Sequence, residues 1–134
     1  MTSRICFAVF AMSALAAVGM RAQSPTGATL SQGRASYDMY CAACHGVSAK
    51  GDGPIAASMR KPPPDLTQLA VRSNGNFSVD DVSRIVDGRK PLSGHGGPDM
   101  PVWGDAFSRS SDPTPVDQKV RSLAFYLASI QAKP

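Results

Sequence analysis

Cys41-Ala42-Ala43-Cys44-His45 places two thiols and one imidazole within five consecutive residues of this 134-residue chain. On a helical turn, residues three and four apart share a face, so Cys44 and His45 project from the same side as Cys41. Two sulfur atoms and a ring nitrogen on one face can hold a single flat group by its edge and from below. The spacing therefore predicts a prosthetic group anchored to a helix.

The motif C-x-x-C-H is the attachment sequence for a c-type haem, with one vinyl group on each thiol and His45 on the iron. A disulfide, a thioredoxin-like redox pair and a zinc site are the other uses of such cysteines. No strand–helix–strand pattern flanks the motif, and a zinc site could draw further ligands only from His95 and aspartates. We therefore expect one covalently bound haem c, with its iron.

The N-terminal residues 1–22 have the pattern of an export signal, in which Arg4 precedes an apolar run. Cleavage after Ala22 would remove Cys6, the third cysteine, together with the signal. This pattern predicts a periplasmic protein. An uncleaved segment that anchors the chain to the membrane is the alternative.

The charge of the chain argues against a nucleic-acid partner, and its composition suggests that the fold needs a prosthetic group to stabilise it. The formal charge is +4, and losing Arg4 and Arg21 with the signal lowers it by two. No basic run with interleaved aromatic residues occurs, so a nucleic-acid partner is not expected. A chain this short, with 12 glycines and 11 prolines, cannot build a large core from its own side chains, so a prosthetic group is expected to support it.

Hydrophobic periodicity predicts an all-α fold of four or five helices, joined by long Gly/Pro loops and preceded by a flexible tail over residues 23–30. Ser31, Ser78 and Thr114 are expected to cap helices at their N-termini, and Gly88 is expected to end one. The helices are expected over residues 31–44, 55–59, 68–71, 79–87 and from 115 onward.

The sixth ligand of the iron would decide what the haem does, since a second strong ligand blocks small molecules and favours electron transfer. The candidates are Met39, Met59, Met100 and His95. Met39 lies too close to the haem motif to cross to the opposite face. Met100 lies far enough along the chain, between Pro98 and Pro101. We expect Met100, with His95 as the alternative.

With these motifs the chain resembles the small monohaem class I c-type cytochromes of bacteria. The resemblance runs over residues 31–131 and implies a cytochrome c domain over 31–134 with the class I fold wrapped around one haem. It also implies that Gly33 allows the first and last helices to cross closely, with Phe125 or Tyr126 as the aromatic partner there.

The resemblance further implies roles for two residues beside the haem. Pro54, in Gly51-Asp52-Gly53-Pro54, is expected to accept a hydrogen bond from His45 through its carbonyl. Trp103, in Met100-Pro101-Val102-Trp103, is expected to pack near the haem and to bind a propionate. A core aromatic residue is the alternative for Trp103.

A one-electron carrier, and not an enzyme, is the function that these features predict. Its partners would be a donor dehydrogenase or membrane complex and an acceptor oxidase or reductase, with membrane contact only if the signal stays uncleaved. A dedicated haem subunit of one dehydrogenase is one alternative. A gas-binding or peroxidase-type haem protein is the other, and it would need an open sixth position.

Overall fold

The computed structural model describes residues 24–89 and 100–133. The predicted signal and His95 lie outside these ranges. Within them the chain is helical and has no strand, which confirms the predicted all-α class. Its elements are α1 (Gly27–Tyr40), α2 (Ala42–His45), η1 (Ala56–Ser58), η2 (Leu66–Gln68), α3 (Leu69–Arg72), α4 (Val79–Asp87), α5 (Trp103–Ser108) and α6 (Val116–Ser129), where η marks a 3₁₀ turn.

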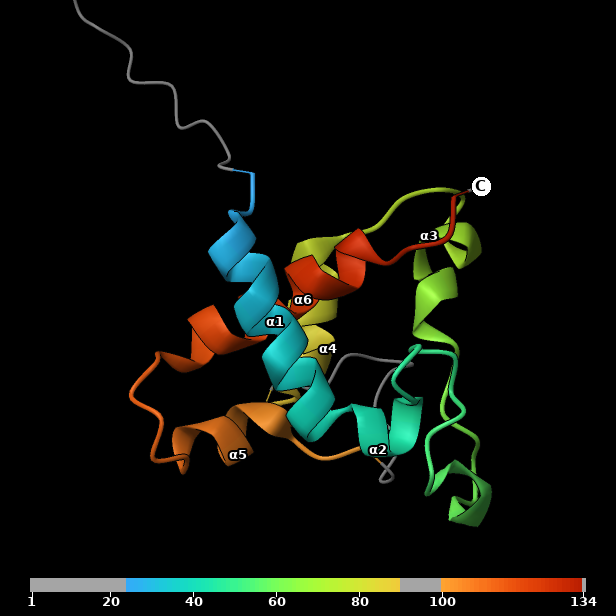
Figure 1. Cartoon of the computed structure of the whole chain (residues 1–134), viewed down its shortest axis with the longest axis horizontal. Coiled ribbons are helices and arrows are strands. Elements are labelled where there is room, and N and C mark those ends of the chain that lie inside the picture. Colours follow the sequence, from blue (N-terminus) through green and yellow to red (C-terminus); the bar gives the residue numbers. More distant parts are fainter. Residues whose placement is uncertain (1–23, 90–99, 134) are drawn as a thin grey trace, which may run out of the picture.

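The first and last long helices, α1 and α6, cross and form the centre of the molecule (Figure 1). Gly33 lies at the crossing, where a Cβ would overlap the Ser122 carbonyl oxygen. The Tyr37 ring lies 5.4 Å from that of Tyr126, centroid to centroid. Tyr126, and not Phe125, is therefore the aromatic residue of this contact.

The buried core extends from this crossing to α4 and α5. It combines Tyr37 of α1 with Leu123 and Leu127 of α6, and it reaches Val86 of α4 and Phe107 of α5. Tyr37 and Leu123 are almost fully buried. Leu123 and Leu127 lie four residues apart on α6, which agrees with the predicted helical period of apolar residues.

The helix boundaries confirm some expected caps and correct others. Ser78 accepts a hydrogen bond from the Asp81 amide, and Gly88 ends α4 in the left-handed conformation, both as predicted. The first helix begins at Gly27, not near Ser31, and Thr26 caps it through the Thr29 amide. Part of the predicted tail is therefore helical.

Two further differences concern the C-terminal part of the chain. At the start of α6 the N-cap is Pro115, without a side-chain bond, whereas Thr114 was expected there. The Thr114 amide instead donates to the Asp112 carboxylate in the preceding turn. The whole of α5 was missed, because its six residues are too few to show a helical period and no side chain caps it.

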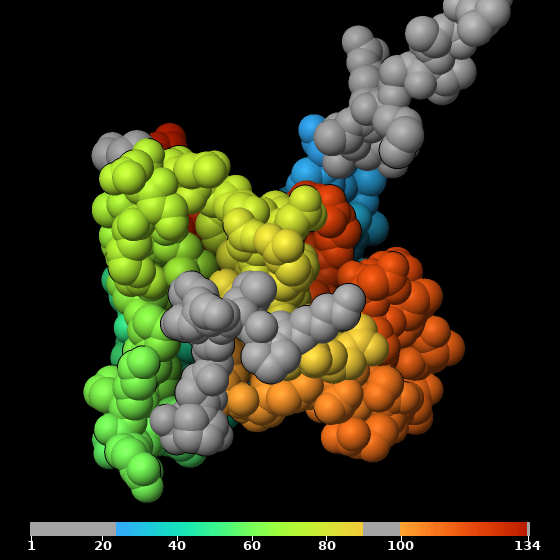
Figure 2. All heavy atoms as spheres, turned by 180° about the vertical axis from the view of Figure 1, so that it is seen from behind, coloured from blue at the N-terminus to red at the C-terminus, as the bar shows by residue number. Residues whose placement is uncertain are grey.

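Residues 46–75, with η1, η2 and α3, lie along one side of this helical core. In the view from behind, this segment (green) forms one edge of the molecule, and α5 and the start of α6 (orange) form the opposite edge (Figure 2). The segment begins directly after α2, so its path determines what surrounds the C-x-x-C-H motif.

Candidate functional site

The two cysteines lie at a helix junction, Cys41 between α1 and α2 and Cys44 within α2. Cys41 separates α1 from α2 with φ −113°, and the His45 amide donates to its carbonyl at 2.9 Å. Cys41 is buried, Cys44 and His45 are half-buried, and Ala43 between them is exposed. Both thiols are free although they lie three residues apart. A C-x-x-C pair that forms no disulfide keeps both sulfur atoms for another bond.

The loop after His45 folds back over the C-terminal end of α2. The amides of Gly51, Gly53 and Ile55 donate to the carbonyls of His45, Cys44 and Ala43, at 2.8, 3.1 and 3.2 Å. These donors satisfy carbonyls that a helix end would otherwise leave unpaired. Their arrangement fixes the loop against the very residues that carry the thiols and the imidazole.

Tyr37 holds the first turn of this loop from the core. Its hydroxyl donates to the Gly46 carbonyl at 2.6 Å in a buried position. Gly46 has φ +80°, which a residue with a side chain rarely adopts. Burial raises the pKa of the Tyr37 hydroxyl, so it stays protonated and remains a donor over the physiological range. The sequence motif contains no signal for this role of Tyr37.

The imidazole of His45 meets the carbonyl of Pro64, with 3.3 Å between Nδ1 and the oxygen. This corrects the assignment of that role to Pro54. Pro54 follows Gly53, whose backbone packs against Ala43 and Cys44 at the carbonyl end of α2. The chain returns to the ring later, where Gly51 packs tightly on the Pro63 carbonyl. The sequence signal for Pro64 was the proline run at 62–64.

A hydrogen on Nδ1 that points to the Pro64 carbonyl leaves Nε2 with its lone pair for a metal ion. Burial lowers the pKa of His45, and the Pro64 carbonyl opposes that shift. Burial dominates, so the ring is neutral at neutral pH. A neutral imidazole with one nitrogen oriented by a carbonyl is the form that an axial haem ligand requires.

The thiols fit haem attachment better than the other uses of a cysteine pair. Burial, with the neighbouring Cys44, raises the pKa of Cys41 to about 12. Redox-active cysteines and zinc ligands need a thiolate, and their pKa is lowered. In the described ranges, no three His, Cys, Asp or Glu side chains converge on a possible metal position. The residues present therefore fit a haem held by two thioethers and His45.

An aromatic cluster joins the end of α1 to α5. Tyr40, the residue before Cys41, contacts Trp103 and Phe107, with ring centroids 5.6 and 5.2 Å away. Trp103 also stacks on Phe107. Trp103 is half-buried and packs against the core beside the cysteine-bearing turn, and its contact with a propionate stays a prediction. Met100 is half-buried and lies three residues before Trp103, so its segment leads directly into the helix that packs on Tyr40.

The other methionines differ in their surroundings. Met39, on α1, is 71% exposed. Met59 is half-buried and ends the η1 turn. His95 is outside the described residues, so the comparison of Met100 with His95 stays a prediction.

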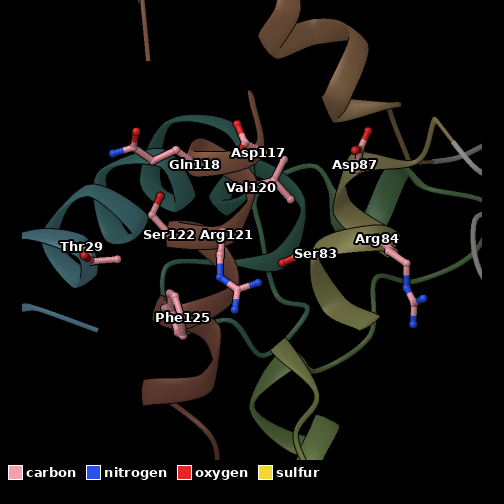
Figure 3. Close-up of a pocket in the computed structure, with 10 residues that line it drawn as sticks. All are labelled: Thr29, Ser83, Arg84, Asp87, Asp117, Gln118, Val120, Arg121, Ser122 and Phe125. Carbon is pink, nitrogen blue, oxygen red and sulfur yellow. The ribbon is translucent and has the colours of Figure 1, made fainter. Parts of the chain in front are cut away.

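A depression of about 430 Å³ lies elsewhere, between α1, α4 and α6 (Figure 3). Ser83 and Arg121 lie on opposite sides of it. Arg121 is already bound to Asp80 at 2.7 Å and lies over the Phe125 ring. None of the lining residues belongs to the C-x-x-C-H motif, so this depression is separate from the haem site.

Comparison with known families gives one result. The family described as Cytochrome c matches residues 30–131 of the chain. Neither the curated proteins nor the solved structures provide a significant match. In the parts of the chain that are described, no helix has the length and apolar character needed to cross a bilayer.

Proposed function

Because the chain belongs to the cytochrome c family of haem-binding electron-transfer proteins, we propose that it is a periplasmic carrier of single electrons. It holds one covalent haem c, attached to Cys41 and Cys44, and exchanges electrons with a donor dehydrogenase or membrane complex and an acceptor oxidase or reductase. The bound haem iron supplies a one-electron couple. The protein residues attach it, orient its ligand and limit access to it.

The observation that carries this proposal is the His45 imidazole, neutral and bound through Nδ1 to the Pro64 carbonyl. That bond fixes the ring plane and makes Nε2 a better electron donor to iron. No acid–base or nucleophilic role remains for His45 once Nε2 is a ligand. The motif therefore supports a redox role at the haem iron, and the sixth ligand decides between electron transfer and chemistry on a bound molecule.

Met100 is the proposed sixth ligand. A thioether favours ferrous iron and so raises the reduction potential. The packing of Trp103 on Tyr40 supports the assignment, because it ties the Met100 segment to the turn that bears Cys41. Met59 provides the control residue for variants of Met100, since its side chain is also half-buried.

The full-length protein, expressed with its own N-terminal segment and purified from the periplasm, tests the proposal. We expect haem to stay with the protein after denaturation and extraction, and the reduced protein to show a c-type α-band. The oxidised protein should show a weak methionine-to-iron band. Haem that is lost on extraction would overturn the proposal.

Variants then test the sixth ligand. Met100→Ala should lose the methionine-to-iron band and bind carbon monoxide when reduced, whereas Met59→Ala should do neither. Carbon monoxide binding by the unaltered protein would favour the gas-binding or peroxidase-type alternative. Stoichiometric co-purification with a single dehydrogenase would favour the dedicated subunit.

A further inference from the structure

The side chain of Gln131 makes three hydrogen bonds just after the end of α6. Its Oε1 accepts from the Ala70 amide at 2.9 Å. Its Nε2 donates to the carbonyls of Leu66 and Leu127, each at 2.8 Å. One amide side chain thereby connects the last turn of α6 with both η2 and α3. The end of the chain lies beside α3 in Figure 1.

These bonds form most of the polar link between residues 66–72 and the helices. The Ala132 amide adds one more bond, to the Thr67 carbonyl at 2.8 Å. On the other side, the Leu66 amide donates to the Ala49 carbonyl at 2.7 Å. Within the described residues, the backbone of this segment is thus held between the loop after the haem motif and the C-terminal residues 131 and 132.

The held segment begins two residues after Pro64, whose carbonyl faces His45. Asp65 accepts from the Thr67 amide at 2.8 Å, which stiffens the chain between Pro64 and η2. Because this connection is short and rigid, a shift of η2 moves the Pro64 carbonyl. At 3.3 Å the contact with Nδ1 is already at the long end for a hydrogen bond, so a small displacement weakens it.

We infer that Gln131 is a positioning residue for the proximal histidine: it fixes η2 and α3 against α6 and thereby sets the distance between the Pro64 carbonyl and His45 Nδ1. The inference rests on the proposed ligation of haem iron by His45. Gln131, which is 86 positions after His45 in the chain, would thereby influence the reduction potential of the iron.

Gln131→Ala in the haem-loaded protein tests this role, with Gln118→Ala as the matched control. Gln118 is an exposed glutamine on α6, the helix that Gln131 follows. A weaker bond from Nδ1 makes the imidazole a poorer electron donor, which favours ferrous iron. We therefore expect the reduction potential to rise in Gln131→Ala and to stay unchanged in Gln118→Ala. The His45 Nδ1 proton, followed by NMR, should exchange with solvent about tenfold faster.

A second variant, Gln131→Glu, removes the two donor bonds without leaving a cavity at residue 131. It keeps the length and an acceptor for the Ala70 amide but loses both donor bonds at neutral pH. Its carboxylate oxygen would face the Leu66 and Leu127 carbonyls without a donor, so we expect η2 to be displaced and the potential to rise as in Gln131→Ala. Gln131→Glu also provides the test of the role of Gln131 if Gln131→Ala fails to fold.

The outcomes distinguish this inference from the proposed function. Unaltered protein without covalent haem, or without a His45 signal shifted by the iron, would overturn the proposed function. Normal haem and His45 signals, together with potentials and Nδ1 exchange that are the same in both Gln131 variants as in the unaltered protein, would overturn the role of Gln131 alone.

Discussion

The rings of Tyr40 and Trp103 lie 5.6 Å apart, centroid to centroid, with their planes tilted by 58°. Tyr40 is the last residue of α1 and Trp103 the first of α5, so this contact joins two elements that are distant in sequence. Phe107 completes the cluster from the next turn of α5. Because α5 has no side-chain cap, we regard this packing as its main support.

Replacing Trp103 should therefore loosen α5. We expect Trp103→Ala to lower the free energy of unfolding by about 3 kcal/mol, and Trp103→Phe by about 1 kcal/mol, because the latter keeps an aromatic ring. Trp103→Ala should also weaken the methionine-to-iron band. Denaturant unfolding and the oxidised spectrum measure the two effects.

Phe125→Ala is the control for that experiment. Phe125 is half-buried like Trp103, but it lies at the depression between α1, α4 and α6. The Phe125→Ala variant should have a lower free energy of unfolding and should keep the methionine-to-iron band. An unchanged band in Trp103→Ala would show that α5 does not hold the Met100 segment.

Gly33 offers a test of the helix crossing. In Gly33→Ala the new methyl group would overlap the Ser122 carbonyl oxygen and lie 2.9 Å from the Tyr126 Cβ. The helices would have to separate, so we expect a loss of about 1–3 kcal/mol in thermal or denaturant unfolding. Gly27→Ala is the matched control in the same helix, because a Cβ there meets nothing within 4 Å. Equal losses in the two variants would contradict this account.

The features that were predictable from the sequence depend on neighbours in the chain. Ser78 binds the amide of Asp81, and Gly88 ends the same helix, so residue types alone reveal both. The haem motif is equally local. Gly33 and Tyr126 were foreseen only through the family resemblance.

The features that were missed depend on tertiary contacts. Pro64 is 19 residues from His45, and it reaches the ring because Gly51 brings the chain back against Pro63. No local pattern distinguishes it from Pro54. Likewise, α5 gains its stability from Tyr40, on a helix far away in sequence. The helix propensities of its residues therefore do not reveal α5, because tertiary packing stabilises it.

The carboxylate of Asp65 should make stability depend on pH. The hydrogen bond from the Thr67 hydroxyl, helped by its amide and by the charges of Arg72 and Lys50, lowers the pKa of Asp65. A lowered folded-state pKa means that the contribution is present above the unfolded pKa of about 4 and is lost as pH falls through the folded value.

Asp65→Asn isolates this effect, because its side-chain oxygen can still accept from the Thr67 amide. The unaltered protein should be more stable than the variant at pH 7, and the difference should shrink below about pH 4. Unfolding in denaturant across this range measures it. A difference that is constant with pH would mean that the charge of Asp65 contributes nothing.

Lys119 is a buried cation whose side chain is only 5% exposed. Its Nζ donates to the Asp112 carbonyl at 2.9 Å, and lies 3.3 Å from the Asp112 carboxylate and 6.0 Å from the centre of the Phe107 ring. The ammonium thus ties the turn before α6 to the aromatic cluster. The Asp112 side chain is 53% exposed, whereas the bond from Nζ to the Asp112 carbonyl is partly buried.

Lys119→Met keeps the length of the side chain and removes the ammonium. Losing a hydrogen bond from a charged donor to a sheltered carbonyl should cost about 2 kcal/mol of unfolding free energy. Asp112→Asn keeps that carbonyl and the acceptor for the Thr114 amide, and removes only a half-exposed ion pair, so it should cost less than Lys119→Met. If Asp112→Asn lost more unfolding free energy than Lys119→Met, the Asp112 carboxylate, and not its carbonyl, would be the main partner of Lys119.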